Sequence, residues 1–308
     1  MLGLSSFQKL VDQVIERNPL QKKALQEHLA IQDQEFWKRA ERVFSGLEEG
    51  LGEDCTTLVQ GYLRLCREML AEQVRFKKTG CYSATSASAV NSALYSTDRE
   101  MTERTCALGV SQFLWPNHYK LFDFFLAQLA ELRQVSKYLE VGPGHGIHLV
   151  FALDFLSEAD VHVIDISEAS LRLARGMVQR FHPGKIVQFH HGDVMEMDVS
   201  GRTHHFDFIV VNEVLEHLDD PAALLTGIRP KLSDRGHLFI TTCANAPTMD
   251  HVYLYRSVEE IQDQIVACGF EIVREIAVPV GDIPREQWTT AKTEINYGAL
   301  LRSVEGKR

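Results

Sequence analysis

The sequence predicts an α/β fold in which a doubly wound, mostly parallel sheet follows an N-terminal helical extension. Three observations lead to this prediction. Residues 138–147 read as an apolar strand, then three glycines at every second position, then the start of a helix. After residue 160, short apolar segments alternate with segments of helical periodicity, which is typical of parallel strands joined by crossover helices. Before residue 133, the apolar residues recur at helical spacing alone.

The glycine-rich turn is the most informative segment. Gly142, Gly144 and Gly146 allow the backbone to pass sharply from strand to helix, and they leave no side chain against a ligand lying over the turn. Such a turn serves several nucleotide ligands, so by itself it does not identify one. The competing interpretation is a nicotinamide-binding domain. That domain normally shows G-x-G-x-x-G, whereas the spacing here is G-x-G-x-G.

The second expected strand, residues 161–165, ends in an acid. This acid, Asp165, lies about 20 residues after the turn, where a nucleoside-binding fold places a carboxylate for ribose hydroxyls. A capping-box pattern, Ser257 with Glu260, predicts the start of a later helix. The other elements expected in this region are helices at 168–181 and 220–232 and strands at 186–189, 206–211, 237–242, 271–280 and 293–300.

The first 133 residues are expected to form helices without strands. Amphipathic periodicity predicts helices at 7–17, 34–47, 57–77 and 120–132. The run at 83–91 consists of small residues and lacks the bulk to build a core. We therefore expect this run to be a linker, or a loop pressed against another part of the protein.

Composition predicts a soluble, cytoplasmic protein. The net charge of −10 argues against a dominant contact with a nucleic-acid backbone. The six cysteines show no C-x-x-C pair, so we expect buried, reduced thiols rather than disulfides or a zinc site. No apolar run approaches the ~20 residues that span a bilayer, and the N-terminus does not read as a secretory signal. The expected partner is a small molecule, with neither nucleic acid nor membrane.

Residues 138–275 resemble the core of a class I S-adenosylmethionine-dependent methyltransferase. The resemblance rests on the glycine turn that follows Glu140, on Asp165, on Gly-Asp-Val at 192–194 and on Glu-Val-Leu-Glu-His at 213–217. It implies a Rossmann-like, seven-stranded sheet and S-adenosylmethionine as the donor substrate. It also divides the chain into a helical extension or lid, residues 1–133, and a catalytic domain, residues 134–308.

The same resemblance implies the residues that bind the donor. The glycines would approach it, Glu140 would hold the loop or the amino group, and Asp165 would accept hydrogen bonds from both ribose hydroxyls. Asp193 would read the adenine edge together with the Val194 amide, although a turn residue that caps its own backbone is the alternative. The full expected set is Glu140, Gly142, Gly144, Gly146, Asp165, Ile166, Asp193, Val194 and Asn212.

The Glu-Val-Leu-Glu-His segment is the candidate catalytic centre. A helical turn would place Glu213 on one face with Glu216 or His217. The pattern resembles that of ubiquinone-pathway O-methyltransferases and small-RNA 2′-O-methyltransferases, in which these residues bind a divalent ion. By that resemblance, the candidate ligands of Mg²⁺, Mn²⁺ or a softer ion, which would activate a substrate hydroxyl, are Glu213, Glu216, His217 and His251.

Our primary expectation is nevertheless a site without metal, because metal-free methyltransferases carry the same motif. His217 or His251 would then act as general base. Tyr253 and Tyr255 could orient a substrate or contact the sulfonium through cation–π attraction. With Glu213, the expected catalytic residues are therefore His217, His251 and Tyr253.

The helical extension is expected to cover the donor. By the resemblance, candidates for a lid are Tyr82, Tyr95, Trp115, His118 and Tyr119, with packing at the joint between extension and core as the alternative. The lid and the loop at 243–255, which leaves the carboxyl end of the sheet, would form the acceptor pocket.

The predicted function is methylation of a small acceptor, in secondary metabolism. One alternative is cyclisation of the donor to azetidine-2-carboxylate with release of methylthioadenosine. Another is a non-catalytic donor-binding protein. Whether the chain forms a homodimer is left open by the sequence.

Overall fold

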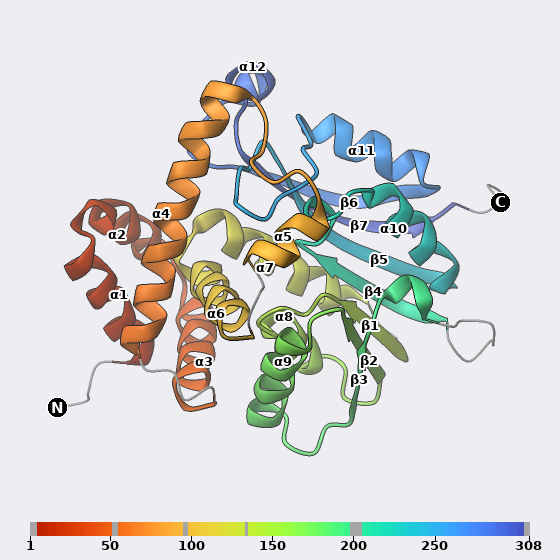
Figure 1. Cartoon of the computed structure of the whole chain (residues 1–308). Coiled ribbons are helices and arrows are strands. Elements are labelled where there is room, and N and C mark those ends of the chain that lie inside the picture. The colour runs from red at the N-terminus through yellow and green to blue at the C-terminus, as the bar shows by residue number, and fades with distance from the viewer. Residues whose placement is uncertain (1–4, 51–54, 95–97, 133–134, 198–204, 305–308) are drawn as a thin grey trace.

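The computed structural model describes residues 5–50, 55–94, 98–132, 135–197 and 205–304 (Figure 1). Its centre is a seven-stranded sheet in the order β3-β2-β1-β4-β5-β7-β6. Strand β7 is antiparallel to both of its neighbours, and the other pairs are parallel. The predicted mostly parallel, Rossmann-like sheet is therefore confirmed. Its strands are β1 (Lys137–Val141), β2 (Asp160–Asp165), β3 (Val187–His191), β4 (Phe206–Asn212), β5 (Leu232–Ala244), β6 (Phe270–Pro279) and β7 (Ile295–Ser303).

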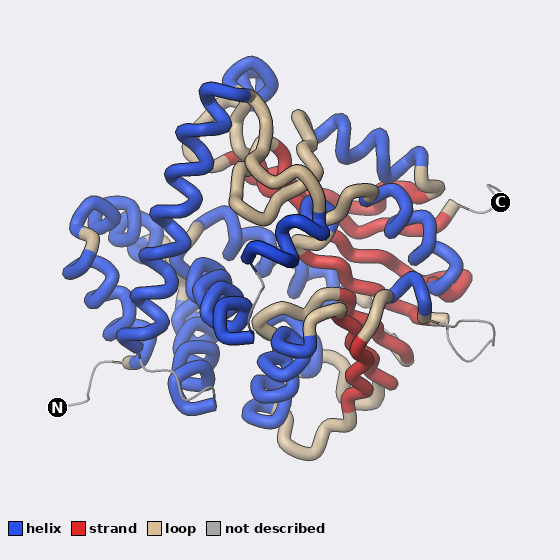
Figure 2. Tube along the Cα trace, in the orientation of Figure 1, coloured by secondary structure: helices blue, strands red, loops and turns tan. Residues whose placement is uncertain are grey.

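Helices lie on both faces of the sheet, as Figure 2 shows. One apolar cluster joins one face to α7, α8 and α9, and a second cluster joins the other face to α10 and α11. Adjacent residues of β1 divide between them, since Tyr138 belongs to the first cluster and Leu139 to the second. These helices are α7 (Pro116–Glu131), α8 (Ile147–Leu153), α9 (Glu168–Phe181), α10 (Pro221–Ile228) and α11 (Val258–Ala267).

The N-terminal extension continues the first of these apolar clusters. Phe7 stacks on Phe44 at 5.0 Å between ring centroids, and Phe113 packs edge-on against Phe122 of α7. Extension and sheet thus share one core, and the boundary expected at residue 133 lies outside the described residues. The helices of the extension are α1 (Ser6–Arg17), α2 (Lys22–Ala30), α3 (Gln34–Gly50), α4 (Cys55–Thr79), α5 (Ala87–Leu94) and α6 (Asp98–Leu114).

Two expectations need correction. Much of the small-residue run at 83–91 is not a loop, because α5 begins at Ala87. The amide of Ala87 donates to the Asp219 carboxylate, and this distant contact fixes the helix start. The cysteines are free, as expected, but Cys81 is exposed, and Cys55 and Cys66 are only partly buried. Within the described ranges, no helix has the length and apolar character needed to cross a membrane.

Candidate functional site

The glycine turn joins β1 to α8 at the carboxyl end of the sheet. The amide of Gly142 donates to the carbonyl of Ile164 on β2 over 2.9 Å, and Gly146 precedes α8 with a φ of 73°. A Cβ at position 146 would lie 2.9 Å from the Cα of Ala174 on α9, whereas a Cβ at 144 would lie 3.9 Å from the Thr105 methyl group of α6. The turn is therefore tightly packed at 146 and roomier at 144, where it faces α6.

Alanine substitutions at these two glycines are expected to differ in their effect on stability. Gly146→Ala should lower the free energy of unfolding by about 2–4 kcal/mol, because the left-handed backbone is unfavourable and the new methyl group overlaps α9. Gly144→Ala should cost about 1–2 kcal/mol, from the backbone conformation alone. Urea unfolding would compare the two variants, and equal losses would contradict this account of the turn.

Glu140 is a buried acid at the end of β1. It is 2% exposed, and the hydroxyl of Tyr138, on the same face of the strand, donates to its carboxyl over 2.6 Å. Burial raises the pKa of Glu140 to about 8, although this hydrogen bond opposes the rise. A cationic group beside the carboxyl would favour its ionised form.

Asp165 stands at the carboxyl end of β2, as expected. Burial raises its pKa to about 6, although the amide of Ser167 donates to its Oδ1 over 2.8 Å. The next residue, Ile166, has 63% of its surface exposed. The carboxylate of Asp165 and the apolar side chain of Ile166 could therefore contact the polar and the apolar parts of a nucleoside.

Asp193 follows β3 and is exposed. Its carboxylate accepts a hydrogen bond from the amide of Met195 over 2.8 Å and caps the 3-10 turn Val194–Glu196. The capping alternative is therefore realised. The role of Asp193 at an adenine edge stays a prediction.

The end of β4 differs from the sequence prediction in its local geometry. Glu213 has a φ of 51° and precedes the 3-10 turn Leu215–His217, so a shared helical turn does not bring Glu213 toward Glu216. Instead, the amide of Glu213 donates to the carbonyl and the hydroxyl oxygen of Thr241 on β5. Burial raises the pKa of Glu213 to about 8, and the negative charge of Glu216 adds to the rise.

Several buried polar atoms here lack a hydrogen-bond partner in the described part of the chain. They are both side-chain polar atoms of Asn212 and the Oε1 atoms of Glu213 and Glu216. Unsatisfied buried groups are rare in folded proteins. Because strand β4 pairs in parallel with β1, these atoms and the glycine turn lie at the same edge of the sheet. The residues present therefore fit a polar ligand that lies across the carboxyl ends of β1, β2 and β4.

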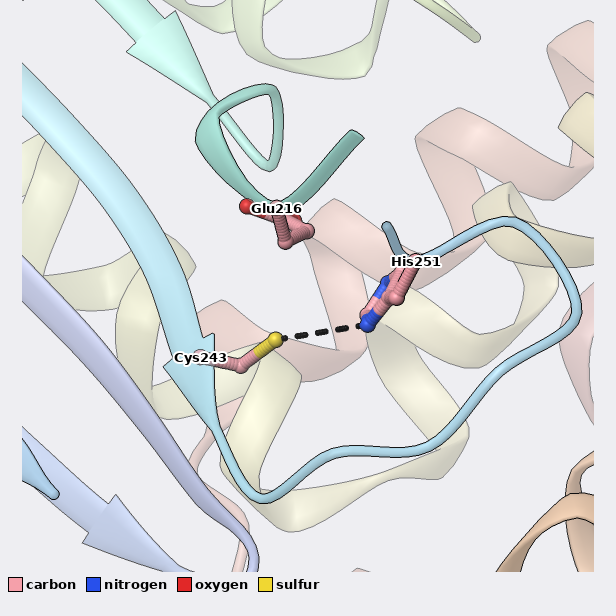
Figure 3. Close-up of side chains that lie close together, drawn as sticks. All are labelled: Glu216, Cys243 and His251. Atoms are coloured by element: carbon pink, nitrogen blue, oxygen red, sulfur yellow. Dashed lines mark hydrogen bonds between the residues drawn. The ribbon is translucent and has the colours of Figure 1, made fainter. Parts of the chain in front are cut away.

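Glu216 meets two further side chains, Cys243 and His251, as Figure 3 shows. Burial raises the pKa of Glu216 to about 7, while the hydroxyl of Thr242 donates to its Oε2 over 2.7 Å. Burial also lowers the pKa of His251 to about 3, so its imidazole is neutral. His217 lies beside His251, with 5.0 Å between ring centroids.

The loop after β5 is fixed to the helical extension by an ion pair. Arg104 of α6 contacts Asp250 through two nitrogens, over 2.8 and 3.0 Å, and also reaches Glu68 of α4. Burial would raise the pKa of Asp250, but the charge of Arg104 outweighs it and holds the pKa well below its usual value. The hydroxyl of Tyr82 accepts a hydrogen bond from the amide of Ala246 in the same loop.

The lid candidates therefore divide. Tyr82 contacts the 243–255 loop, whereas Trp115 donates to Tyr62 of α4 and Tyr119 packs on Phe36. His118 accompanies Trp115 at that joint, with ring centroids 4.8 Å apart. The packing alternative thus describes Trp115, His118 and Tyr119, while Tyr95 lies outside the described residues.

Tyr253 and Tyr255 face α11. Their rings lie 4.7 Å apart, and the hydroxyls of both tyrosines bond to the Gln264 side chain. These contacts hold the loop against the helix layer. A role for Tyr253 in orienting substrate stays a prediction.

Two residues of the site were missed by sequence reasoning. Arg104 reads as an ordinary charge on a helix, and Cys243 as one more apolar residue of a buried strand. No short-range pattern marks either residue, since their partners lie on other elements.

Buried titratable groups give the protein a pH optimum of stability. Burial raises the pKa of Glu140, Glu213 and Glu216 to about 8, 8 and 7, so the folded state favours their neutral forms. Ionising these carboxyl groups in the folded protein costs free energy. Stability is therefore lost as the pH rises from their pKa values in the unfolded state toward about 8.

The buried histidines act in the opposite direction. Burial lowers the pKa of His118 and His145 to about 4 and that of His148 and His251 to about 3. Their contribution to the free energy of unfolding is present above the pKa that histidine has in the unfolded state, and it is lost as the pH falls through 6.5 toward these lowered pKa values. Urea midpoints should therefore peak near pH ~6 and fall toward both pH ~4.5 and pH ~8.5. A steady increase up to pH ~8.5 would contradict this expectation.

Comparison with known proteins agrees with this architecture. A family model described as a methyltransferase domain matches residues 116–274, just over half of the chain. A ubiquinone biosynthesis O-methyltransferase from Aromatoleum aromaticum (strain DSM 19018 / LMG 30748 / EbN1) is 31% identical over 109 residues. The aligned region covers 35% of this chain and 44% of that relative, so the chain spans less than half of the curated relative's length.

Solved structures are similar to this chain at low sequence identity. The mitomycin 7-O-methyltransferase MmcR superposes with a TM-score of 0.51 and 13% identity, covering 77% of this chain and 68% of MmcR. The N-methyltransferase NodS from Bradyrhizobium japonicum WM9, solved with S-adenosyl-L-homocysteine, gives a TM-score of 0.46 at 17% identity, covering 62% and 92% of the two chains. From the family match and the sheet together, the chain belongs to the methyltransferase domain family, within the class I, S-adenosylmethionine-dependent methyltransferases.

Proposed function

We propose that this protein transfers the methyl group of S-adenosylmethionine to a small-molecule acceptor. The observation that carries the proposal is the set of polar groups at the carboxyl ends of β1, β2 and β4. The glycine turn, the Asp165 carboxylate and the unsatisfied atoms of Asn212 and Glu213 come together there. S-adenosylmethionine supplies an activated methyl group on a sulfonium.

The chain's own residues would position this donor. Asp165 would accept from both ribose hydroxyls, and Ile166 would pack on the base. Glu140 and Glu213, both buried, would face the ammonium and sulfonium charges, which would shift them to their ionised forms. Asn212 would use its unsatisfied amide on the amino acid part of the donor.

The acceptor would lie between the helical extension and the loop at 243–255. Displacement at the methyl carbon forms one bond to the acceptor and breaks one bond to sulfur, so alignment provides most of the rate enhancement. The acceptor proton would pass to Nε2 of His217, whose Nδ1 donates to the Asp250 carbonyl over 2.9 Å. His251 is a weaker candidate base, because burial lowers its pKa to about 3.

Donor cyclisation is the second candidate, and the closed extension favours it. Tyr82, Ala87 and Arg104 each bond to the edge where the strands end, at Ala246, Asp219 and Asp250 respectively. A closed site suits a reaction that needs no second substrate. In that reaction the donor's own amine, after losing a proton to solvent, would attack the aminocarboxypropyl carbon attached to sulfur. A C–N bond forms as that C–S bond breaks, and methylthioadenosine leaves.

Product analysis distinguishes the candidates. We expect incubation with S-adenosylmethionine alone to give no turnover, and addition of small phenols or amines to yield S-adenosylhomocysteine together with a methylated acceptor. Methylthioadenosine from donor alone would establish the second candidate. If S-adenosylhomocysteine failed to bind in a calorimetric titration, both candidates would fail. The cytoplasmic location, the secondary-metabolite role and the absence of nucleic-acid or membrane partners stay predictions, and the oligomeric state stays open.

A further inference from the structure

A buried tyrosine on β1 adjoins the proposed donor site. Tyr138 is 0% exposed and lies two residues before Glu140, on the same face of the strand. Side chains on the inner face of a parallel strand are usually apolar, and the Tyr138 ring packs against Phe208 of β4 with 6.1 Å between ring centroids. Its hydroxyl is the polar exception. A buried hydroxyl needs a hydrogen-bond partner, and Glu140 is that partner.

The bond between the two side chains has the length of a bond from a hydroxyl to a charged carboxylate. The Tyr138 hydroxyl lies 2.6 Å from Oε2 of Glu140, within the range of about 2.5–2.7 Å that is usual when the acceptor is ionised. Because this bond uses Oε2, the other carboxylate oxygen is left to face a ligand. Tyr138 therefore both orients the carboxyl group and favours its ionised form.

The residues next to Glu140 indicate where that ligand lies. Val210 of β4 is opposite Glu140, and Asn212 follows Val210 on the same face of the sheet. Both polar atoms of the Asn212 side chain are buried without a hydrogen-bond partner among the described residues. The glycine turn begins at Gly142, two residues after Glu140. A polar line of Tyr138, Glu140 and Asn212 thus crosses one face of the sheet toward the amino acid part of the proposed donor.

Burial and Tyr138 act on Glu140 in opposite directions. Burial raises the pKa of Glu140 to about 8, while the hydrogen bond from Tyr138 lowers it. The residues opposite Glu140 on β2 and β4 are valines. His145 of the glycine turn and His148 of α8 are neutral, because burial lowers their pKa values to about 4 and 3. At neutral pH the Glu140 carboxyl is therefore mostly protonated until a cation approaches it.

We propose that Tyr138 is a positioning residue for the donor, which holds the Glu140 carboxylate in place and ionised against the donor ammonium. This inference rests on the proposed function. On binding, the ammonium keeps its charge, the Glu140 carboxyl gives its proton to solvent, and Tyr138 stabilises the carboxylate that remains. Because the free protein then holds more protons than the complex, affinity for the donor rises with pH while Glu140 is protonated in the free protein.

S-adenosylhomocysteine has the same amino acid part as the donor and serves as the probe. Calorimetric titration in phosphate and in Tris, which differ in ionisation enthalpy, should detect the release of up to about one proton from Glu140 at pH ~7. The affinity should increase about tenfold or more between pH ~6 and pH ~7.5. Tyr138→Phe should weaken binding about tenfold or more at pH ~7 and move this increase to higher pH, because the carboxylate loses a charge-assisted hydrogen bond.

Glu140→Gln separates this effect from the other acids at the strand ends, Asp165 and Glu213, whose pKa values burial also raises. This variant should release fewer protons on binding and should show a flatter dependence of affinity on pH. Adding Tyr138→Phe to Glu140→Gln should then cost much less affinity than Tyr138→Phe alone, because no carboxylate remains for the hydroxyl to stabilise. Urea unfolding would check that each variant is folded.

Tyr297→Phe is the matched control. Tyr297 is also 0% exposed and donates to Glu275 over 2.6 Å, but it belongs to the apolar cluster on the opposite face of the sheet. This variant should bind S-adenosylhomocysteine like wild type at every pH. Wild-type affinity and wild-type proton release in Tyr138→Phe would overturn the inference and leave the proposed function intact. Absence of binding in the wild-type protein would overturn both.

Discussion

Replacing Arg104 with methionine is expected to lower the free energy of unfolding by about 3–5 kcal/mol, because it leaves the Asp250 carboxylate buried without its charge partner. The Asp250 side chain is 4% exposed and that of Arg104 13%, so water cannot readily take the place of the guanidinium. The loss should appear as a lower midpoint in urea unfolding at neutral pH.

Two variants test whether the uncompensated charge is the cause. Arg104→Met combined with Asp250→Asn should recover much of the loss, since no buried charge then remains. Arg64→Met removes the ion pair between Arg64 of α4 and Glu103 of α6, but Arg64 is 51% exposed, so this change should cost under ~1 kcal/mol. A similar loss in both single variants would contradict the special weight given to Arg104.

Asp165→Ala is expected to weaken S-adenosylhomocysteine binding about 100-fold or more. A hydrogen bond to a charged group is worth about 1.5–3 kcal/mol, two ribose hydroxyls would share this carboxylate, and about 1.4 kcal/mol corresponds to tenfold. Urea unfolding would show that the variant stays folded although the Ser167 amide loses its acceptor. Calorimetric titration would measure the change in affinity.

The matched control is Asp160→Ala, at the opposite end of the same strand. Asp160 bonds to the Gln188 side chain and pairs with Lys137, away from the glycine turn. This variant should bind S-adenosylhomocysteine like wild type. Unchanged affinity in Asp165→Ala would remove the ribose assignment, and with it the proposed orientation of the donor.

Elements with strong local signals could be predicted closely from the sequence. Helix α9 spans Glu168–Phe181 as expected, because Ser167 caps its start and the apolar residues recur on one face. The start of α5 could not be predicted, because its small residues show little periodicity and its first amide donates to Asp219. That contact is tertiary and leaves no trace in the local pattern.

The site shows the same division. Glu140 and Asp165 were found because each lies at or next to the end of an apolar strand, and strand ends are visible in the hydrophobic pattern. The left-handed backbone of Glu213 was not foreseen, because a glutamate has no preference for positive φ and the amide contacts with Thr241 hold it there. The contact of Arg104 with Asp250 joins a helix to a loop 146 positions later, and no spacing rule connects them.

The bonds from the helical extension to the strand ends have a kinetic consequence. If the product lies between the helical extension and the 243–255 loop, as proposed, the Arg104–Asp250 pair and the Tyr82 contact would have to part before it leaves. Turnover would then be limited by the rate of opening rather than by chemistry, as in many enzymes that close over their substrates. Loosening these two contacts would then shorten the residence time of S-adenosylhomocysteine and also admit solvent to the reacting groups.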